Sequence, residues 1–179
     1  MSDECRKCAL AGTSCCQGTQ IVLTTGDLSR ISAFLGEEGF HTVELPDLQY
    51  LDPGYDPEWL SLTLRPDGRR LVLKRSSELR CCFLQEKGCR LPADLRPLIC
   101  RLHPYAYTRE GILGIDETCP LANDPGWPFR LEGMGMPAQT AREWHRLLYA
   151  ELQADRDREL PPLRPPRPAA PCGPVRVCA

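Results

Sequence analysis

Cysteine is the residue type in this chain most able to do chemistry, with eleven copies among 179 residues. Cys5 and Cys8 form a C-x-x-C pair, a spacing that lets two thiolates from one tight turn reach a single metal ion. Cys15 and Cys16 follow closely. A second group of cysteines lies further along the chain, at Cys81, Cys82, Cys89, Cys100 and Cys119. Because zinc and iron both accept thiolate ligands, the two groups together predict a metal centre.

A disulfide framework is the other common reason for many cysteines. The opening sequence, MSDECRKCAL, lacks the apolar run of a secretory signal, and no stretch approaches the roughly 18 apolar residues that cross a bilayer. We therefore expect a cytoplasmic protein, in which reducing agents keep most cysteines as thiols. The odd number of cysteines also argues against complete pairing.

The charge balance gives no sign of a polyanionic partner. Lys and Arg number 22 against 24 Asp and Glu, which leaves a formal charge of −2. Nucleic acid and anionic lipid are bound through basic patches, so we expect no nucleic acid and no membrane as partners. The expected partner is a metal ion, and protein partners stay open.

No catalytic motif accompanies the cysteines. The chain has no G-x-G-x-x-G dinucleotide loop, no G-x-x-x-x-G-K-S/T phosphate loop and no C-x-x-x-C-x-x-C spacing of radical enzymes. Non-enzymatic metal binding is therefore the preferred function. Two alternatives stay open: an Fe–S centre that passes electrons in a redox enzyme, and a thiol–disulfide switch at Cys5 and Cys8.

The ordered set of motifs resembles the YkgJ-type CxxCxxCC cysteine-cluster family, which is described as zinc- or iron-chelating or as containing an Fe–S cluster. The matching residues in the opening block are Cys5-Arg-Lys-Cys8, Cys15-Cys16, Ile21-Val-Leu-Thr24, Asp27, Arg30-Ile31 and Leu35-Gly36. The later matching residues are Cys81-Cys82-Phe83-Leu84, Cys89, Arg96-Pro97-Leu-Ile-Cys100-Arg101-Leu-His103-Pro104 and Cys119-Pro120.

The resemblance implies a chelated cofactor, either zinc or iron, and leaves open whether iron is bound as an ion or as a 4Fe–4S cluster. The cysteines that it marks as ligands are Cys5, Cys8, Cys15, Cys16, Cys81, Cys89, Cys100 and Cys119. Eight sulfurs suffice for two four-sulfur sites or for one cluster with reserve thiols. Successive side chains diverge in extended chain, so the adjacent Cys15 and Cys16 favour two sites, or one ligand beside a buried thiol. The sulfur count exceeds what one structural zinc requires, which favours iron slightly.

Positive charge is expected near the ligands. Four thiolates around a divalent ion leave a net charge of about −2, so a buried site needs cationic or N–H donors around it. Arg96 and Arg101 bracket Cys100 and are the expected cofactor-binding residues.

Other candidates have simpler interpretations. Cys82 is expected to pack as a small apolar residue behind Cys81. His103 occupies an aromatic position of the resembled family and is expected to pack there. His41 and His145 are expected at the surface, and Cys172 and Cys178 lie in a proline-rich tail that offers no scaffold.

The elements that position these cysteines follow from residue patterns. Residues 21–23 predict a short buried strand, and Thr24 with Asp27 predicts a helix cap. The helix that follows presents a buried face, formed by Leu28, Ile31, Phe34 and Leu35. A short strand is expected over residues 42–45, and alternating leucines predict a hairpin between residues 60 and 73 with a turn at 66–68.

The second half of the chain predicts a further hairpin at 105–115 and a helix after Pro137. The predicted fold class is α+β: a small, irregular, metal-stabilised domain with short helices, β-hairpins, a C-terminal helix and a disordered proline-rich tail. We expect residues 1–125 to form the cysteine-cluster metal-binding domain, 126–159 a helical extension and 160–179 the tail.

Overall fold

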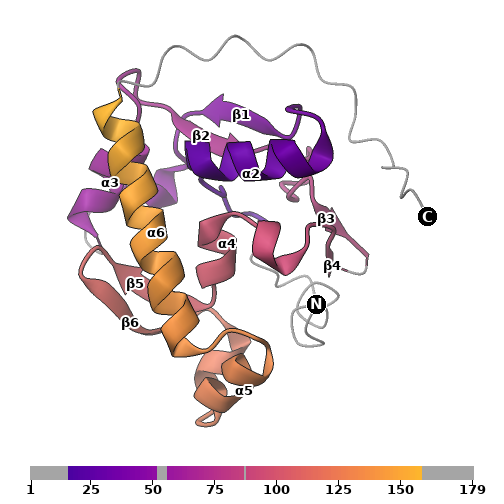
Figure 1. The fold of residues 1–179 in the computed structure, drawn as a ribbon, viewed down its shortest axis with the longest axis vertical. Helices are drawn as coiled ribbons and strands as arrows, with labels where there is room; N and C mark the ends of the chain where they lie inside the picture. The colour runs from indigo at the N-terminus through magenta and orange to yellow at the C-terminus, as the bar shows by residue number, and fades with distance from the viewer. Residues whose placement is uncertain (1–15, 52–55, 87, 159–179) are drawn as a thin grey trace.

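The computed structural model of the protein describes residues 16–51, 56–86 and 88–158. Its fold is α+β, as the sequence predicts, with short helices, small antiparallel hairpins and one long C-terminal helix (Figure 1). In chain order the elements are α2 (Thr25–Leu35), β1 (His41–Glu44), η1 (Leu48–Tyr50), α3 (Pro57–Thr63), β2 (Arg70–Leu73), β3 (Leu84–Gln85), β4 (Gly88–Cys89), η2 (Ala93–Leu95), α4 (Leu98–Leu102), β5 (Tyr105–Thr108), β6 (Gly111–Ile115), η3 (Pro120–Asn123), α5 (Trp127–Gly133) and α6 (Ala138–Asp157). The tail expected at 160–179 lies outside the described residues.

The capping pair expected at Thr24 and Asp27 starts helix α2. The Thr24 hydroxyl accepts the N–H of Asp27 at 2.9 Å, and the Asp27 carboxylate accepts the N–H of Thr24 at 3.3 Å. The helix ends at Gly36, which has a left-handed φ of +69°. Ile31 is fully buried, but Phe34, expected on the same buried face, is 52% exposed. The buried stripe of α2 is therefore narrower than the periodicity predicts.

Strand β2 lies between two partners. On one edge it pairs antiparallel with β1, which lies one residue earlier than the predicted 42–45, and Val43 stands opposite Leu71. On the other edge, the N–H of Leu23 donates to the carbonyl of Leu71 at 2.9 Å. Residues 21–23 are buried as expected, although their pairing with β2 is limited to one bridge and its flanking hydrogen bonds.

The hairpin predicted between residues 60 and 73 is wrong in its first strand. Residues 60–63 belong instead to helix α3. The helix starts before them because the Asp56 side chain accepts the N–H of Glu58 at 3.0 Å and Pro57 suits a first helical turn. The predicted turn is present and contains Gly68 with a φ of +75°. The strand that leaves it, β2, pairs with β1 rather than with the leucines before the turn.

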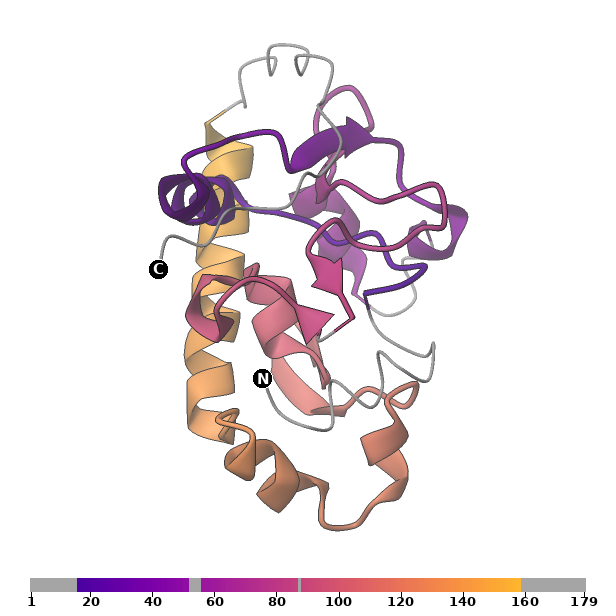
Figure 2. The same ribbon diagram turned by 90° about the vertical axis from the view of Figure 1, so that its right-hand side faces the viewer.

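The elements predicted in the second half of the chain are both present. Strands β5 and β6 form the antiparallel hairpin, with Thr108 opposite Gly111. Helix α6 begins after Pro137, runs along the length of the molecule and contacts α2, α3, α4 and β6 (Figure 2). Among the described residues, no helix combines the length and the apolar composition that crossing a bilayer requires.

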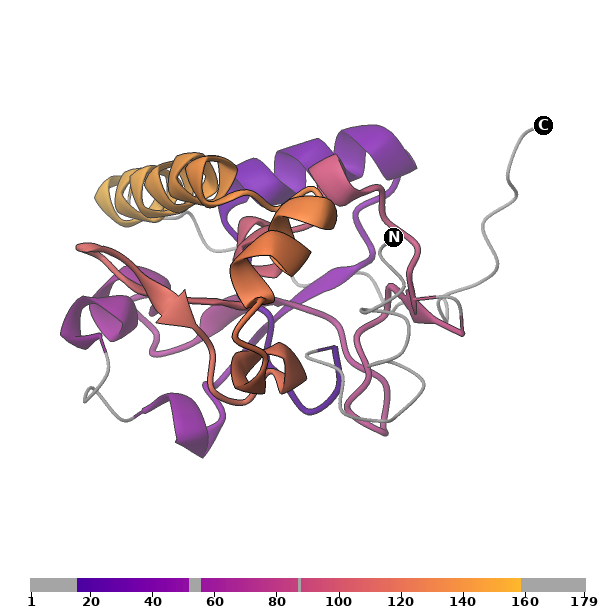
Figure 3. The same ribbon diagram turned by 90° about the horizontal axis from the view of Figure 1, so that it is seen from below.

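Two hydrophobic clusters form the interior, and helix α4 belongs to both. The cysteine-side cluster surrounds β2 and consists of Ile21, Leu23, Ile31, Phe40, Leu71, Leu73, Cys81, Phe83 and Leu91. The helix-side cluster consists of Leu62, Leu98, Leu102, Tyr105, Leu131, Ala141, Leu148, Tyr149 and Leu152. Seen from below, α2 and α6 lie along one side of the molecule, and the β5–β6 hairpin lies next to α6 (Figure 3). Ile99 and Cys100 of α4 pack against the cysteine-side cluster, whereas Leu98 and Leu102 lie in the helix-side cluster.

Candidate metal centre

Cys16 and Cys81 are held together by the backbone. The N–H of Cys81 donates to the carbonyl of Cys16 at 2.9 Å, and the neighbouring residues Gln17 and Arg80 form an antiparallel bridge. Cys81 is buried among the leucines around β2, whereas Cys16 is partly exposed at the edge of the same cluster. Two cysteines 65 positions apart in the sequence therefore share one backbone pairing.

Cys89 comes to the same region through the small β3–β4 hairpin. Cys89 stands opposite Leu84, which follows Cys81 by three residues, and it packs against the same apolar cluster. The N–H of Arg90 donates to the carbonyl of Phe83 at 2.9 Å and closes the base of the hairpin. The turn thus brings Cys89 back toward Cys81.

Cys100 reaches the region from helix α4. Its N–H donates to the carbonyl of Pro97 at 2.9 Å, so its backbone is fixed within the first turn of the helix. Burial raises the pKa of the Cys100 thiol well above its usual value. Negative charge on the three other sulfurs, those of Cys16, Cys81 and Cys89, raises it further. All four cysteines lie in or against the cysteine-side cluster, so they come to one region of the molecule.

The sulfur of Cys81 is surrounded by hydrogen-bond donors. The N–H of Phe83 donates to it at 3.5 Å. A hydrogen bond from Cys82 is the largest cause of a lowered pKa for Cys81, and the N–H groups of Phe83 and Leu84 add to the effect against the opposing influence of burial. This arrangement suits a sulfur that carries negative charge.

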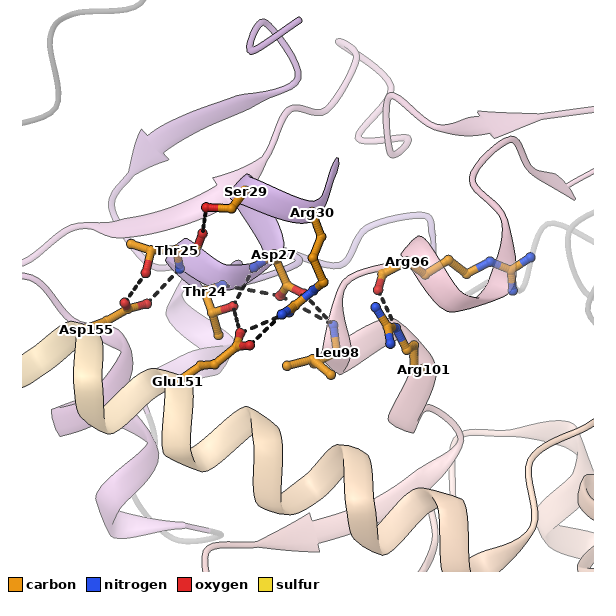
Figure 4. Close-up of polar contacts among 10 residues, drawn as sticks. All are labelled: Thr24, Thr25, Asp27, Ser29, Arg30, Arg96, Leu98, Arg101, Glu151 and Asp155. Atoms are coloured by element: carbon orange, nitrogen blue, oxygen red, sulfur yellow. Dashed lines mark hydrogen bonds and ion pairs between the residues drawn. The ribbon is translucent and has the colours of Figure 1, made fainter. Parts of the chain in front are cut away.

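Arg96 and Arg101 lie in different surroundings. The pKa of the Cys89 thiol is raised, because burial outweighs the N–H of Leu91 and the positive charge of Arg96, which both act to lower it. Arg101 instead donates from Nε to the carbonyl of Arg96 at 2.7 Å (Figure 4). Burial and then the charge of Arg30 lower the pKa of Arg101, and the charges of Asp27, Asp94 and Glu151 oppose this shift.

The remaining candidates are placed as follows. Cys119 is buried in the turn after β6, where its N–H donates to the carbonyl of Asp116 at 2.9 Å. Cys82 packs against the cysteine-side cluster, and its sulfur donates to the carbonyl of Phe40 at 3.6 Å. Burial lowers the pKa of His103, which is partly exposed. Cys5, Cys8, Cys15, Cys172 and Cys178 lie outside the described residues.

The expectation that His145 lies at the surface is wrong. His145 is 7% exposed, its Nε2 lies 2.6 Å from the carbonyl oxygen of Thr108, and its ring packs 4.8 Å from that of Tyr149. The helix α6 turns this residue toward the β5–β6 hairpin. His41 is partly exposed and stacks edge-on against Phe40.

A buried polar network joins α2, α4 and α6 beside this region (Figure 4). The Asp27 carboxylate accepts the N–H of Leu98, the first residue of α4, at 3.1 and 3.3 Å. Arg30 bonds to Asp27 at 2.7 Å and to both carboxylate oxygens of Glu151, at 2.5 and 3.0 Å. Thr24 donates from its hydroxyl to Glu151. The sequence predicts only the Thr24–Asp27 part, because Glu151 has no local pattern that links it to residues more than 120 positions away.

Gly26 makes room for this network. A Cβ built on Gly26 would overlap the carboxylate of Glu151, so the lack of a side chain there lets α6 approach the first turn of α2. Glu151 cannot simply swing aside, because Thr24 and Arg30 hold its oxygens.

Within the described part of the chain, no group of three or more His, Cys, Asp or Glu side chains is close enough to hold an ion by itself. The thiols of Cys16, Cys81, Cys89 and Cys100 therefore share one region of the molecule without being close enough together to coordinate one ion. A family model described as "Putative zinc- or iron-chelating domain", with the name CxxCxxCC, matches residues 4–120. No curated protein and no solved structure gives a significant match.

Proposed function

The chain belongs to the CxxCxxCC family of zinc- or iron-chelating domains, and from this membership we propose that Cys16, Cys81, Cys89 and Cys100 contribute to one metal centre. The observation that carries the proposal is the gathering of four sulfurs from separate segments at the edge of one apolar cluster. Chance would scatter four cysteines over such a chain, whereas thiolate ligands of one ion must converge.

The chemistry of the gathered residues fits a soft cation. Burial and then the charge of three other sulfurs raise the pKa of Cys100, and a cation between the sulfurs would stabilise their thiolate forms. Donors already surround Cys81, and Arg96 offers positive charge to Cys89. When bound, zinc would supply a structural cross-link, and iron would add the capacity to carry an electron.

We propose that Cys5, Cys8 and Cys15 complete the ligand set and that Cys119 serves the same or a second site. The finer assignment that we propose is iron in a 4Fe–4S cluster, which, like a structural zinc, takes four thiolates, so eight cysteines would suffice for two such sites. A cluster would give the protein the capacity to carry an electron, and electron transfer is the redox form of this proposal. Chelation of zinc without redox chemistry is the alternative.

Anaerobic purification without an affinity metal, followed by elemental analysis for zinc, iron and acid-labile sulfide, tests the proposal. We expect at least one bound metal ion per chain. Iron with matching sulfide and broad visible absorption would support the cluster, and colourless protein with zinc would support the alternative. Protein that takes up neither metal, before or after anaerobic reconstitution, would refute the chelating function.

Single serine variants then test the ligand set. Cys81→Ser and Cys100→Ser should each lower the bound metal per chain, because each removes one of the gathered sulfurs. Cys82→Ser is the matched control: Cys82 lies next to Cys81 and is not among the proposed ligands, and the serine hydroxyl keeps a hydrogen-bond donor at the position that contacts Cys81 and the carbonyl of Phe40. Full metal retention by both Cys81→Ser and Cys100→Ser would remove these two residues from the site.

A further inference from the structure

We propose that Asp27 is a positioning residue for the metal centre: its carboxylate fixes the helix that carries Cys100. The inference rests on the proposed function and extends it from the ligands to the residue that places one of them. It arises from the hydrogen bonds that join this one buried side chain to both α2 and α4, while Glu151 of α6 bonds to its partner Arg30 (Figure 4).

Asp27 is 1% exposed and accepts hydrogen bonds from two helix starts at once. The N–H of Thr24, at the cap of α2, lies 3.3 Å from its carboxylate, and the N–H of Leu98, at the start of α4, lies 3.1 Å away. Arg30 balances the charge from 2.7 Å. A local capping box needs only the first of these contacts, so the bond to Leu98 is an additional use of the same group.

Helix α4 depends on this outside acceptor because it cannot cap itself. The residue before Leu98 is Pro97, which has no side-chain oxygen to accept the N–H groups of the first turn. The helix spans only five residues, 98–102. Asp27 therefore supplies from another helix the acceptor that a serine or aspartate would supply locally.

The bond to Leu98 fixes Cys100 because both lie in one helical turn. The N–H groups of Cys100 and Arg101 both donate to the carbonyl of Pro97, at 2.9 and 3.0 Å. The side chain of Leu98 is fully buried in the helix-side cluster and fixes the opposite face of the same turn. A shift of Leu98 would consequently move the Cys100 sulfur relative to the other thiols.

Asp155 provides a matched control. Its carboxylate is also buried, accepts the N–H of Thr25 at 2.8 Å, and bonds to the Thr25 hydroxyl, so it too supports the start of α2 from outside. Its hydrogen bonds go to Thr25 in the first turn of α2, whereas Asp27 also accepts the N–H of Leu98 in α4. Loss of Asp155 should weaken the α2–α6 packing without moving Cys100.

The test compares metal binding by Asp27→Ala, Asp27→Asn and Asp155→Ala in the full chain. Apo protein is titrated anaerobically with Co²⁺, followed by its thiolate charge-transfer absorption, and zinc affinity is measured by competition with a chromophoric chelator. The measurements are made well below the unfolding temperature of each variant. We expect Asp27→Ala to bind zinc at least about tenfold more weakly and to show an altered Co²⁺ spectrum.

The two other variants separate positioning from general stability. Asp27→Asn keeps one oxygen for the N–H of Leu98, so it should retain more affinity than Asp27→Ala, while Asp155→Ala should keep the wild-type affinity and spectrum despite a lower melting temperature. If Asp27→Ala does not fold, an Asp27→Asn protein with unchanged affinity and spectrum overturns the inference.

Wild-type affinity and spectrum in Asp27→Ala, or an equal loss in Asp155→Ala, would also overturn the inference while leaving the chelating function intact. Failure of the wild-type chain to bind Co²⁺ or zinc would refute the proposed function and the inference with it. The wild-type titration therefore distinguishes the two failures.

Discussion

Replacing Gly26 by alanine should destabilise the protein, although alanine is the better helix former. Gly26 lies in the first turn of α2 with an ordinary helical backbone, and the added methyl would overlap the carboxylate of Glu151. The side chain of Glu151 would have to leave its hydrogen bonds with Thr24 and Arg30. No polar group is deleted, so the change tests the spatial fit of the network alone.

The magnitude follows from two opposing contributions. Alanine gains about 1 kcal/mol over glycine in a helix. Each hydrogen bond to a charged group contributes about 1.5 kcal/mol at the lower end of its range, which suits side chains such as Arg30 and Glu151 that keep some contact with solvent. If the Thr24 bond and the bidentate Arg30 pair are counted as two such contacts, their loss against one propensity gain leaves a net destabilisation of about 2 kcal/mol.

Denaturant unfolding at fixed metal loading measures this change. For a chain of this size a loss of about 2 kcal/mol corresponds to a fall of roughly 4–8 °C in Tm. Gly133→Ala is the control, because Gly133 ends helix α5 with no atom near its virtual Cβ and should be neutral or slightly stabilised. In a Glu151→Ala background, Gly26→Ala should change sign and stabilise the protein by up to about 1 kcal/mol.

The sign change is the decisive result. Neutral or stabilising behaviour of Gly26→Ala in the wild-type background would show that the Glu151 carboxylate leaves at no cost. An equal destabilisation with and without Glu151 would show that the methyl clashes with something other than this side chain. Either result would refute the reasoning that Gly26 exists to admit Glu151.

Three further outcomes follow from the structure. Tyr149→Phe should destabilise the protein by about 1.5–3 kcal/mol in urea unfolding, because it deletes the buried 2.6 Å bond to Asp56, yet it should leave metal content unchanged. Burial opposes ionisation of Glu151, but bonds from Arg30 and Thr24 prevail and lower its pKa. Its contribution to stability is therefore present above the unfolded pKa of about 4.3 and is lost as pH falls through the folded value, so Glu151→Gln should show a shallower loss of stability in acid than wild type. Removal of the metal by a chelator should lower the Tm of the wild type and have a smaller effect on the Tm of Cys81→Ser. An equal fall in the Tm of both proteins would contradict the proposed site.

Local signals were sufficient for several elements. The capping pair at Thr24 and Asp27, the turn at Gly68 and the hairpin at 105–115 all depend on residues a few positions apart, and the structure contains each of them. The cysteine motifs were likewise visible, because ligand spacing within a turn is a short-range property.

Non-local choices were not predictable from one sequence. Leucines at alternate positions from Leu60 onward fit a strand, but the cap at Asp56 and the proline that follows it fit a helix, and the helix buries Leu62 against α6. The partner of strand β2 was also ambiguous, because its pairing with β1 depends on packing rather than on turn length. His145 gave no sign of burial, because its burial depends on a contact with the carbonyl of Thr108 in the distant β5–β6 hairpin, while Tyr149 is its neighbour one turn along α6.

The packing of helix α4 against α6 determines where the cooperatively folding segment ends. The family match stops at residue 120, but Leu98 and Leu102 of α4 are fully buried against leucines of α6, beyond residue 138. A fragment cut at the limit of the family match would expose that face and leave Arg30 without Glu151. The segment by which the family is recognised is thus smaller than the segment that must fold cooperatively, and fragments made for metal analysis should extend through Asp157 at least.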